Sequence, residues 1–195
     1  MATLRAINAN NPSFTDKDHL HSYFETYESL FTPMKETANA VLEIGIGDFY
    51  EENGGSIWLW RQFFTNAKIY GIDTLPAGRV HPSIVNDESV VLHTGTDAYD
   101  EKFVHNAFLY PCIRFDVIID DGPHTLESMR ECIRLYSSML TDTGMLVIED
   151  VQETSWLKSL IDSTPTSLQG YIQIFDLRHV KNRSDDILFV INKAA

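Results

Sequence analysis

The stretch Val41-Leu42-Glu43-Ile44-Gly45-Ile46-Gly47 decides the fold class of this chain. A short apolar run that ends in glycines is typical of a buried strand followed by a turn. Two further apolar runs, 68–73 and 115–120, end in Asp73 and Asp120, and segments with helical spacing separate the runs. Strands that alternate with helices predict an α/β fold, with a mostly parallel sheet and helices on both faces.

The expected elements follow one another without a linker or an internal repeat. The patterns predict helices from Asp16 to the neighbourhood of Pro33 and at 56–66, 97–108, 125–140 and 154–161, and strands at 41–45, 68–73, 89–93, 115–120, 144–149, 171–177 and 187–192. We expect the last two strands to pair as a terminal antiparallel hairpin with weaker burial. Residues 1–14 are expected to form a loose arm, and residues 1–35 together a lid or an interface. The length of 195 residues predicts a single domain, 1–195.

Composition excludes several classes of protein. The chain has 15 Lys and Arg against 28 Asp and Glu, a net charge of −13, which disfavours nucleic acid and anionic membranes as partners. The apolar runs are shorter than the roughly 20 residues of a membrane-spanning helix. The start of the chain has no apolar leader segment, and only two cysteines occur. We therefore expect a reduced, cytoplasmic protein.

The turn after the first strand favours a nucleoside ligand. Gly45 and Gly47 let a backbone approach a ligand closely. A dinucleotide fingerprint would need a third glycine where Tyr50 stands, which argues against a pyrophosphate and against a nicotinamide dehydrogenase. Asp73, at the end of the second strand, is placed to accept hydrogen bonds from a ribose diol. Together these residues predict a site for an adenosyl ligand without a pyrophosphate.

Four carboxylates follow two other strands: Asp120 and Asp121 after one, Glu149 and Asp150 after the other. If the strands are neighbours, these groups repel one another, and no Lys or Arg within the two motifs neutralises them. Oxygen ligands without a thiolate favour magnesium, manganese or calcium over zinc. His124, three residues after Asp121, is the candidate general base.

Other histidines and aromatic residues have no comparable context. His19, His21, Tyr23 and Tyr27 lie on the N-terminal helix, where we expect them to pack or to face solvent.

With these motifs the chain resembles the class I S-adenosylmethionine-dependent methyltransferases, whose fold is Rossmann-like with a seven-stranded sheet. More specifically, it resembles the metal-dependent sugar O-methyltransferases of the macrocin and mycinamicin type. The resemblance rests on Asp16-Lys17 with His21, Tyr23 and Tyr27, on 41–47, on 54–60 continuing to 66–73, on 118–124 and on 144–150. Two positions depart from the family pattern: Pro123 replaces a usual serine, and Thr96-Asp97-Ala98-Tyr99-Asp100 replaces an Asp-Gln-Ser-Asp-like run.

The resemblance implies a set of site residues. Magnesium or manganese would bind Asp121, Glu149 and Asp150, and His124 would act as base beside Asp121. S-Adenosylmethionine would bind at the strand ends, with Asp120 facing its amino group and the adenine near Thr96 and Asp97. The residues assigned to the cofactor are Glu43, Gly45, Gly47, Asp73, Thr96, Asp97 and Asp120.

The implied reaction is methylation of a hydroxyl on a sugar or deoxysugar of a glycan or glycoside. The family also implies a homo-oligomer. A catechol-like diol would suit the same metal. A non-haem iron hydroxylase is disfavoured because a facial triad needs two histidines and only His124 follows a strand. A catalytically inactive binding protein is disfavoured by the intact acidic motifs.

Overall fold

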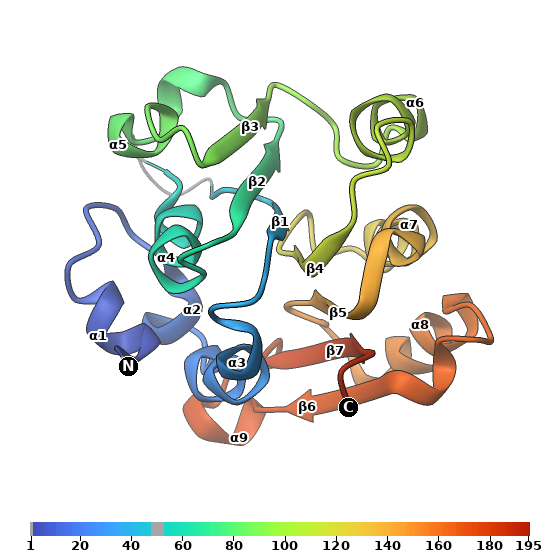
Figure 1. Cartoon of the computed structure of the whole chain (residues 1–195). Helices are drawn as coiled ribbons and strands as arrows, with labels where there is room; N and C mark the ends of the chain where they lie inside the picture. The colour runs from blue at the N-terminus through green and yellow to red at the C-terminus, as the bar shows by residue number, and fades with distance from the viewer. Residues whose placement is uncertain (1, 48–52) are drawn as a thin grey trace.

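A seven-stranded sheet runs through the molecule in the order β3-β2-β1-β4-β5-β7-β6 (Figure 1). The computed structural model describes residues 2–47 and 53–195, so Tyr50 lies outside the described residues. The strands are β1 (Ala40–Ile44), β2 (Lys68–Asp73), β3 (Val90–Thr94), β4 (Phe115–Asp120), β5 (Leu140–Ile148), β6 (Ile172–Asp176) and β7 (Ile187–Asn192). Strands β1 to β5 pair in parallel, and β7 pairs antiparallel with both β5 and β6. The predicted α/β fold, with its mostly parallel seven-stranded sheet, is confirmed.

The strand register brings the predicted site residues to one edge. Ile44 of β1 is the partner of both Ile72 and Asp120, and Asp120 is in turn the partner of Ile148. The residues that follow these positions therefore leave the sheet side by side. The strand order reverses between β1 and β4, which is where ligands bind in sheets of this kind.

Helices cover both faces of the sheet, as Figure 1 shows. They are α1 (Leu4–Asn8), α2 (Asp16–His19), α3 (Tyr23–Phe31), α4 (Gly55–Phe63), α5 (Pro82–Val85), α6 (Glu101–Val104), α7 (Leu126–Tyr136), α8 (Leu157–Ser163) and α9 (Arg178–Lys181). Side chains alternate along each strand. Val41 therefore packs in the core under α3 and α4, and Leu42 packs in the opposite core under α7 and α8. None of the described helices is both long and apolar enough to cross a bilayer.

The N-terminal segment differs from the prediction. Residues 4–8 form α1, and Leu4 is fully buried, so this part is not a loose arm. The expected helix from Asp16 is two helices, because Ser22 has a non-helical backbone with φ −112° and ψ 31°. The aromatic residues of α3 join the main core.

The C-terminal strands also differ in burial. Their antiparallel pairing is confirmed, but β7 is buried at every position because it lies between β5 and β6. Only β6, at the edge, has the weaker burial that the sequence suggested for both strands.

Candidate active site

A cavity of about 720 Å³ opens at the carboxyl edge of the sheet. Its wall combines the turns after five strands with two segments from the ends of the chain. The lining residues include Ile44, Gly45, Gly47, Ile72–Leu75, Thr96–Tyr99, Asp121–His124, Asp150, Gln152, Asp16, Leu20, His21, Arg183 and Asp185. The turns after β1, β2, β3, β4 and β5 thus meet in one cavity, as the sequence predicted.

At the β2 side of the cavity, backbone N–H groups fix the Asp73 carboxylate. Oδ2 accepts a hydrogen bond from the Ile46 N–H at 2.6 Å, and Oδ1 accepts one from the Leu75 N–H at 2.8 Å. A carboxylate has further lone pairs, so Asp73 can still accept hydrogen bonds from a diol. Thr96 and Asp97 line the same cavity. The geometry is therefore compatible with the cofactor contacts predicted for all three residues.

The packing of the neighbouring turn also requires glycine at position 45. Its φ is +86°, and a Cβ atom there would lie 1.8 Å from the carbonyl oxygen of Asp121. The Asp121 N–H also donates to the Ile44 carbonyl at 2.8 Å. The close approach that Gly45 allows is thus first of all that of the turn after β4. Gly47, with φ +115°, lines the cavity beside it.

Two of the residues predicted to contact the cofactor, Glu43 and Asp120, are not among the lining residues of the cavity. Glu43 is fully buried on the same face of β1 as Val41, and burial raises its pKa to about 7. Asp120 is 3% exposed and accepts a hydrogen bond from the Tyr99 hydroxyl at 2.6 Å, while burial raises its pKa to about 6. Tyr99 lines the cavity in front of it. Neither carboxylate lines the cavity, because the strand ends direct both side chains into the interior.

A buried lysine neutralises part of the acidic cluster, which the sequence analysis missed. Lys17 of α2 is fully buried, and its Nζ lies 2.7 Å from Oδ2 of Asp121 and 3.2 Å from Oε1 of Glu43. It also donates to both oxygens of Glu149, at 2.8 and 2.7 Å. The two acidic motifs themselves contain no sign of this cation, since Lys17 is 104 residues from Asp121 in the sequence.

Two tyrosines of α3 hold the carboxylate pair after β5. The Tyr23 hydroxyl donates to Oδ1 of Asp150, and the Tyr27 hydroxyl donates to Oε1 of Glu149. Burial raises the pKa of Tyr27 well above its usual value, so the hydroxyl stays protonated and can donate. The prediction that these tyrosines only pack or face solvent was wrong. Their spacing of four residues, which puts both on one helix face, was the available signal.

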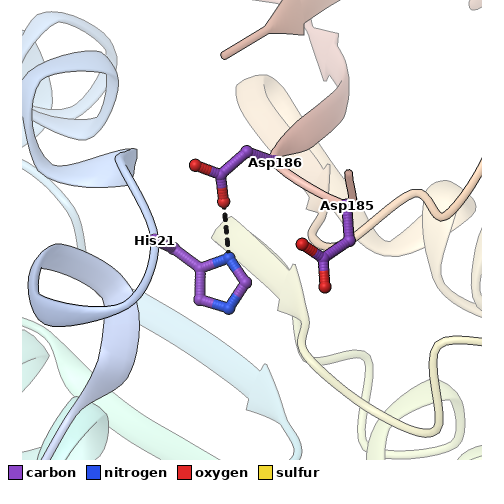
Figure 2. Close-up of side chains that lie close together, drawn as sticks. All are labelled: His21, Asp185 and Asp186. Carbon is purple, nitrogen blue, oxygen red and sulfur yellow. Dashed lines mark hydrogen bonds and ion pairs between the residues drawn. The ribbon is translucent and has the colours of Figure 1, made fainter. Parts of the chain in front are cut away.

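The expectation that His21 only packs or faces solvent was also wrong. It follows α2, is 3% exposed and lines the cavity. Its Nδ1 lies 2.7 Å from Oδ1 of Asp186, which precedes β7, and 3.3 Å from Oδ1 of Asp150 (Figure 2 shows the Asp186 contact). The sequence argument against a two-histidine site is therefore incomplete, because His21 and His124 both approach Asp150.

His124 stands between the free oxygens of two aspartates. Its Nε2 lies 3.7 Å from Oδ1 of Asp121 and 3.7 Å from Oδ2 of Asp150. The backbones of His124 and Asp150 are left-handed, with φ of +53° and +54°, a conformation that costs non-glycine residues energy and that clusters at functional sites. The turn presents His124 to the cavity although Pro123 stands where the family has serine.

The carboxylates that face the cavity fit a divalent cation. Ligand atoms of Asp121, His124 and Asp150 lie within 4.8 Å of one another. Burial, and after it the nearby Asp121, raise the pKa of Asp150 to about 7. Oxygen donors suit magnesium or manganese. The predicted ligand Glu149 groups instead with Asp121 and Glu43, whose ligand atoms also lie within 4.8 Å of one another, and both its oxygens accept from Lys17.

Comparisons with known proteins give the chain its relatives. It is 31% identical to mycinamicin VI 2''-O-methyltransferase of Micromonospora griseorubida, over 82% of this chain and 46% of that protein. It is 29% identical to 8-demethyl-8-alpha-L-rhamnosyl tetracenomycin-C 2'-O-methyltransferase of Streptomyces olivaceus, over 73% of this chain and 36% of that protein. No family model matches the sequence. The chain therefore spans less than half the length of these curated relatives.

A solved structure agrees with this relationship. The MycE methyltransferase of the mycinamycin biosynthetic pathway, in complex with Mg and SAH, superposes with a TM-score of 0.72 at 25% identity. The match covers 98% of this chain and 55% of that one. By sequence and fold, the chain is a homologue of the sugar O-methyltransferases of the tetracenomycin, mycinamicin and macrocin type, with the class I S-adenosylmethionine methyltransferase fold.

Proposed function

We propose that this chain is an S-adenosylmethionine- and divalent-metal-dependent O-methyltransferase that acts on a sugar hydroxyl of a glycoside. One observation supports this most: Asp73 and the trio of Asp121, His124 and Asp150 line a single cavity at the switch point of the sheet. An adenosyl cofactor and an acceptor could thus meet inside that cavity. The relatives named above, which methylate glycosides, support the sugar as acceptor.

The β1, β2 and β3 side of the cavity would bind the methyl donor. Asp73 is held by two backbone N–H groups, so it would meet the ribose hydroxyls without first having to change its rotamer. The positive φ at Gly47 favours glycine, and glycine leaves the wall there without a side chain. Thr96 and Asp97 would lie beside the adenine.

The acceptor hydroxyl needs a base, because an alcohol is a poor nucleophile at neutral pH. His124 is the candidate: its side chain is 31% exposed, and its Nε2 is aimed between two aspartate oxygens. It would take the hydroxyl proton as the acceptor oxygen attacks the methyl carbon in line. Holding acceptor and donor in this geometry supplies much of the rate.

Asp121 and Asp150, which both flank His124, would hold the cation. When bound, a magnesium or manganese ion supplies positive charge that orients neighbouring acceptor oxygens and lowers the pKa of the attacking hydroxyl. Glu149 would hold the Lys17 ammonium, which in turn pairs with Asp121.

Calorimetry and a methyl-transfer assay test this function. We expect one S-adenosylmethionine site, in magnesium and also in excess chelator. We expect methyl transfer to a glycoside such as methyl α-L-rhamnopyranoside only with the metal, and none to catechol. Absence of S-adenosylmethionine binding in both buffers would overturn the methyltransferase. If the chain methylates catechol in preference to the glycoside, the acceptor is a catechol-like diol and not a sugar.

A further inference from the structure

A buried carboxylate stands behind the cavity wall, where the mechanism does not use it. Asp186 is fully buried and belongs to the segment that leads into β7. Its Oδ1 lies 2.7 Å from Nδ1 of His21, and His21 lines the cavity. Asp186 can therefore affect the cavity through His21 without touching a ligand.

His21 in turn reaches Asp150. The same Nδ1 lies 3.3 Å from Oδ1 of Asp150, and the imidazole stacks on the Tyr23 ring at a centroid distance of 4.9 Å. The Tyr23 hydroxyl donates to that same oxygen. His21 and Tyr23 thus both contact Oδ1 of Asp150, and Oδ2 lies on the side of His124.

We propose that His21 and Asp186 are positioning residues that fix the Asp150 carboxylate for the divalent cation. A carboxylate that is hydrogen-bonded to Nδ1 orients an imidazole ring and sets which ring nitrogen carries the hydrogen. Here the oriented ring keeps Asp150 from rotating, so that the same oxygen always faces the cavity. This inference rests on the proposed metal dependence of the chain.

A second cation between His21, Asp185 and Asp186 is the competing interpretation, since their ligand atoms lie within 4.8 Å of one another. It would need a nitrogen of His21, and Nδ1 is already in contact with Asp186. It would also need Asp185, whose oxygens accept from Arg183 at 3.1 and 2.9 Å. In Figure 2 the other oxygen of Asp186 points away from His21 and Asp185. The hydrogen-bonded arrangement therefore fits better.

Manganese titration of the purified chain, read by electron paramagnetic resonance, tests the proposal without an acceptor. The variants are Asp186→Asn and His21→Phe, the latter keeping a ring on Tyr23. We expect each to raise the Kd for Mn²⁺ by about 10–100-fold, the usual cost of losing an outer partner of a metal ligand. The double variant should cost little more than either single variant, since the two residues act as one unit.

Asp185→Asn is the matched control. It removes the same charge one residue away, from a carboxylate that pairs with Arg183 instead of His21. It should leave the Kd for Mn²⁺ within about twofold, because the Asp185 carboxylate pairs with Arg183 and is not among the contacts of Asp150. S-Adenosylmethionine binding in chelator should be unchanged in all variants, which shows that they fold. His21→Phe decides the test if Asp186→Asn does not fold.

Three results would overturn the inference. Unchanged Mn²⁺ affinity in folded Asp186→Asn and His21→Phe would remove the positioning role and leave the proposed function intact. Two Mn²⁺ ions per wild-type chain, with one lost in both Asp185→Asn and Asp186→Asn, would show a second metal site instead. No Mn²⁺ binding by the wild type would overturn both this inference and the metal dependence on which it rests.

Discussion

Lys17 and Glu149 form a forked ion pair in the interior, with Nζ 2.8 Å from Oε1 and 2.7 Å from Oε2. The two residues are 132 positions apart in the sequence. Glu43 and Asp121 complete the shell around the ammonium. A single positive charge therefore serves three carboxylates, and it comes from the short helix α2 at the start of the chain.

Replacing this lysine should destabilise the protein strongly. Lys17→Met leaves three carboxylates without their cation, and breaking a buried pair costs about 3–5 kcal/mol of unfolding free energy. Urea unfolding measures the loss. Lys158→Met, at an exposed i,i+4 pair on α8, is the control and should change stability by less than about 0.5 kcal/mol.

The same variant should gain more from metal than the wild type does. With the ammonium gone, a divalent cation can bind the oxygens of Asp121 and Glu149 that Lys17 holds. Magnesium should therefore raise the melting temperature of Lys17→Met more than that of the wild type. Equal shifts would mean that the ammonium and the metal do not share these carboxylates.

Asp73→Ala should weaken binding of the methyl donor. Hydrogen bonds to a charged group are worth about 1.5–3 kcal/mol, so the Kd for S-adenosylmethionine should rise about 10–100-fold. Calorimetry in chelator measures it. Manganese affinity should stay the same, since Asp73 is not part of the cluster around His124. A parallel loss of both affinities would point to disruption of the turn that Asp73 holds.

His124→Gln should separate binding from chemistry. Loss of a general base lowers kcat by about 10²–10⁴-fold. Affinity for S-adenosylmethionine should be kept, because His124 contacts the aspartates rather than Asp73. The measurement is single-turnover methyl transfer at saturating donor. Turnover close to that of the wild type would assign the base to another residue.

Gly45→Ala should be far more harmful than Gly95→Ala. Both glycines have positive φ, +86° and +63°, so each alanine meets a backbone cost of about 1–2 kcal/mol. At Gly45 the added Cβ would also lie 1.8 Å from the Asp121 carbonyl, whereas at Gly95 it meets nothing within 4 Å. Thermal unfolding of the two variants compares them. Equal losses would mean that the turn after β4 moves aside without cost.

The sequence predicted the sheet and the residues at its edge because these depend on local pattern. β2 and β4 begin and end at the predicted residues, and Asp73, Asp121, His124 and Asp150 all line the cavity. The predicted helix 97–108 was less accurate. The Asp100 side chain accepts hydrogen bonds from the backbone N–H groups of Lys102 and Phe103, so α6 starts at Glu101. The helix then continues into a wider helical turn at 105–109.

The sequence by itself determined the alternation of strands and helices, and with it the edge at which glycines and carboxylates collect. It could not determine which cation meets those carboxylates, because Lys17 contacts them only in the folded chain. Nor could it show that Tyr23 and His21 contact Asp150, that Asp186 contacts His21, or that Glu43 and Asp120 are not among the residues that line the cavity. Local pattern fixes where a side chain leaves its own strand or helix. The partners of that side chain depend on packing between segments far apart in the chain, and this packing exists only in the folded protein.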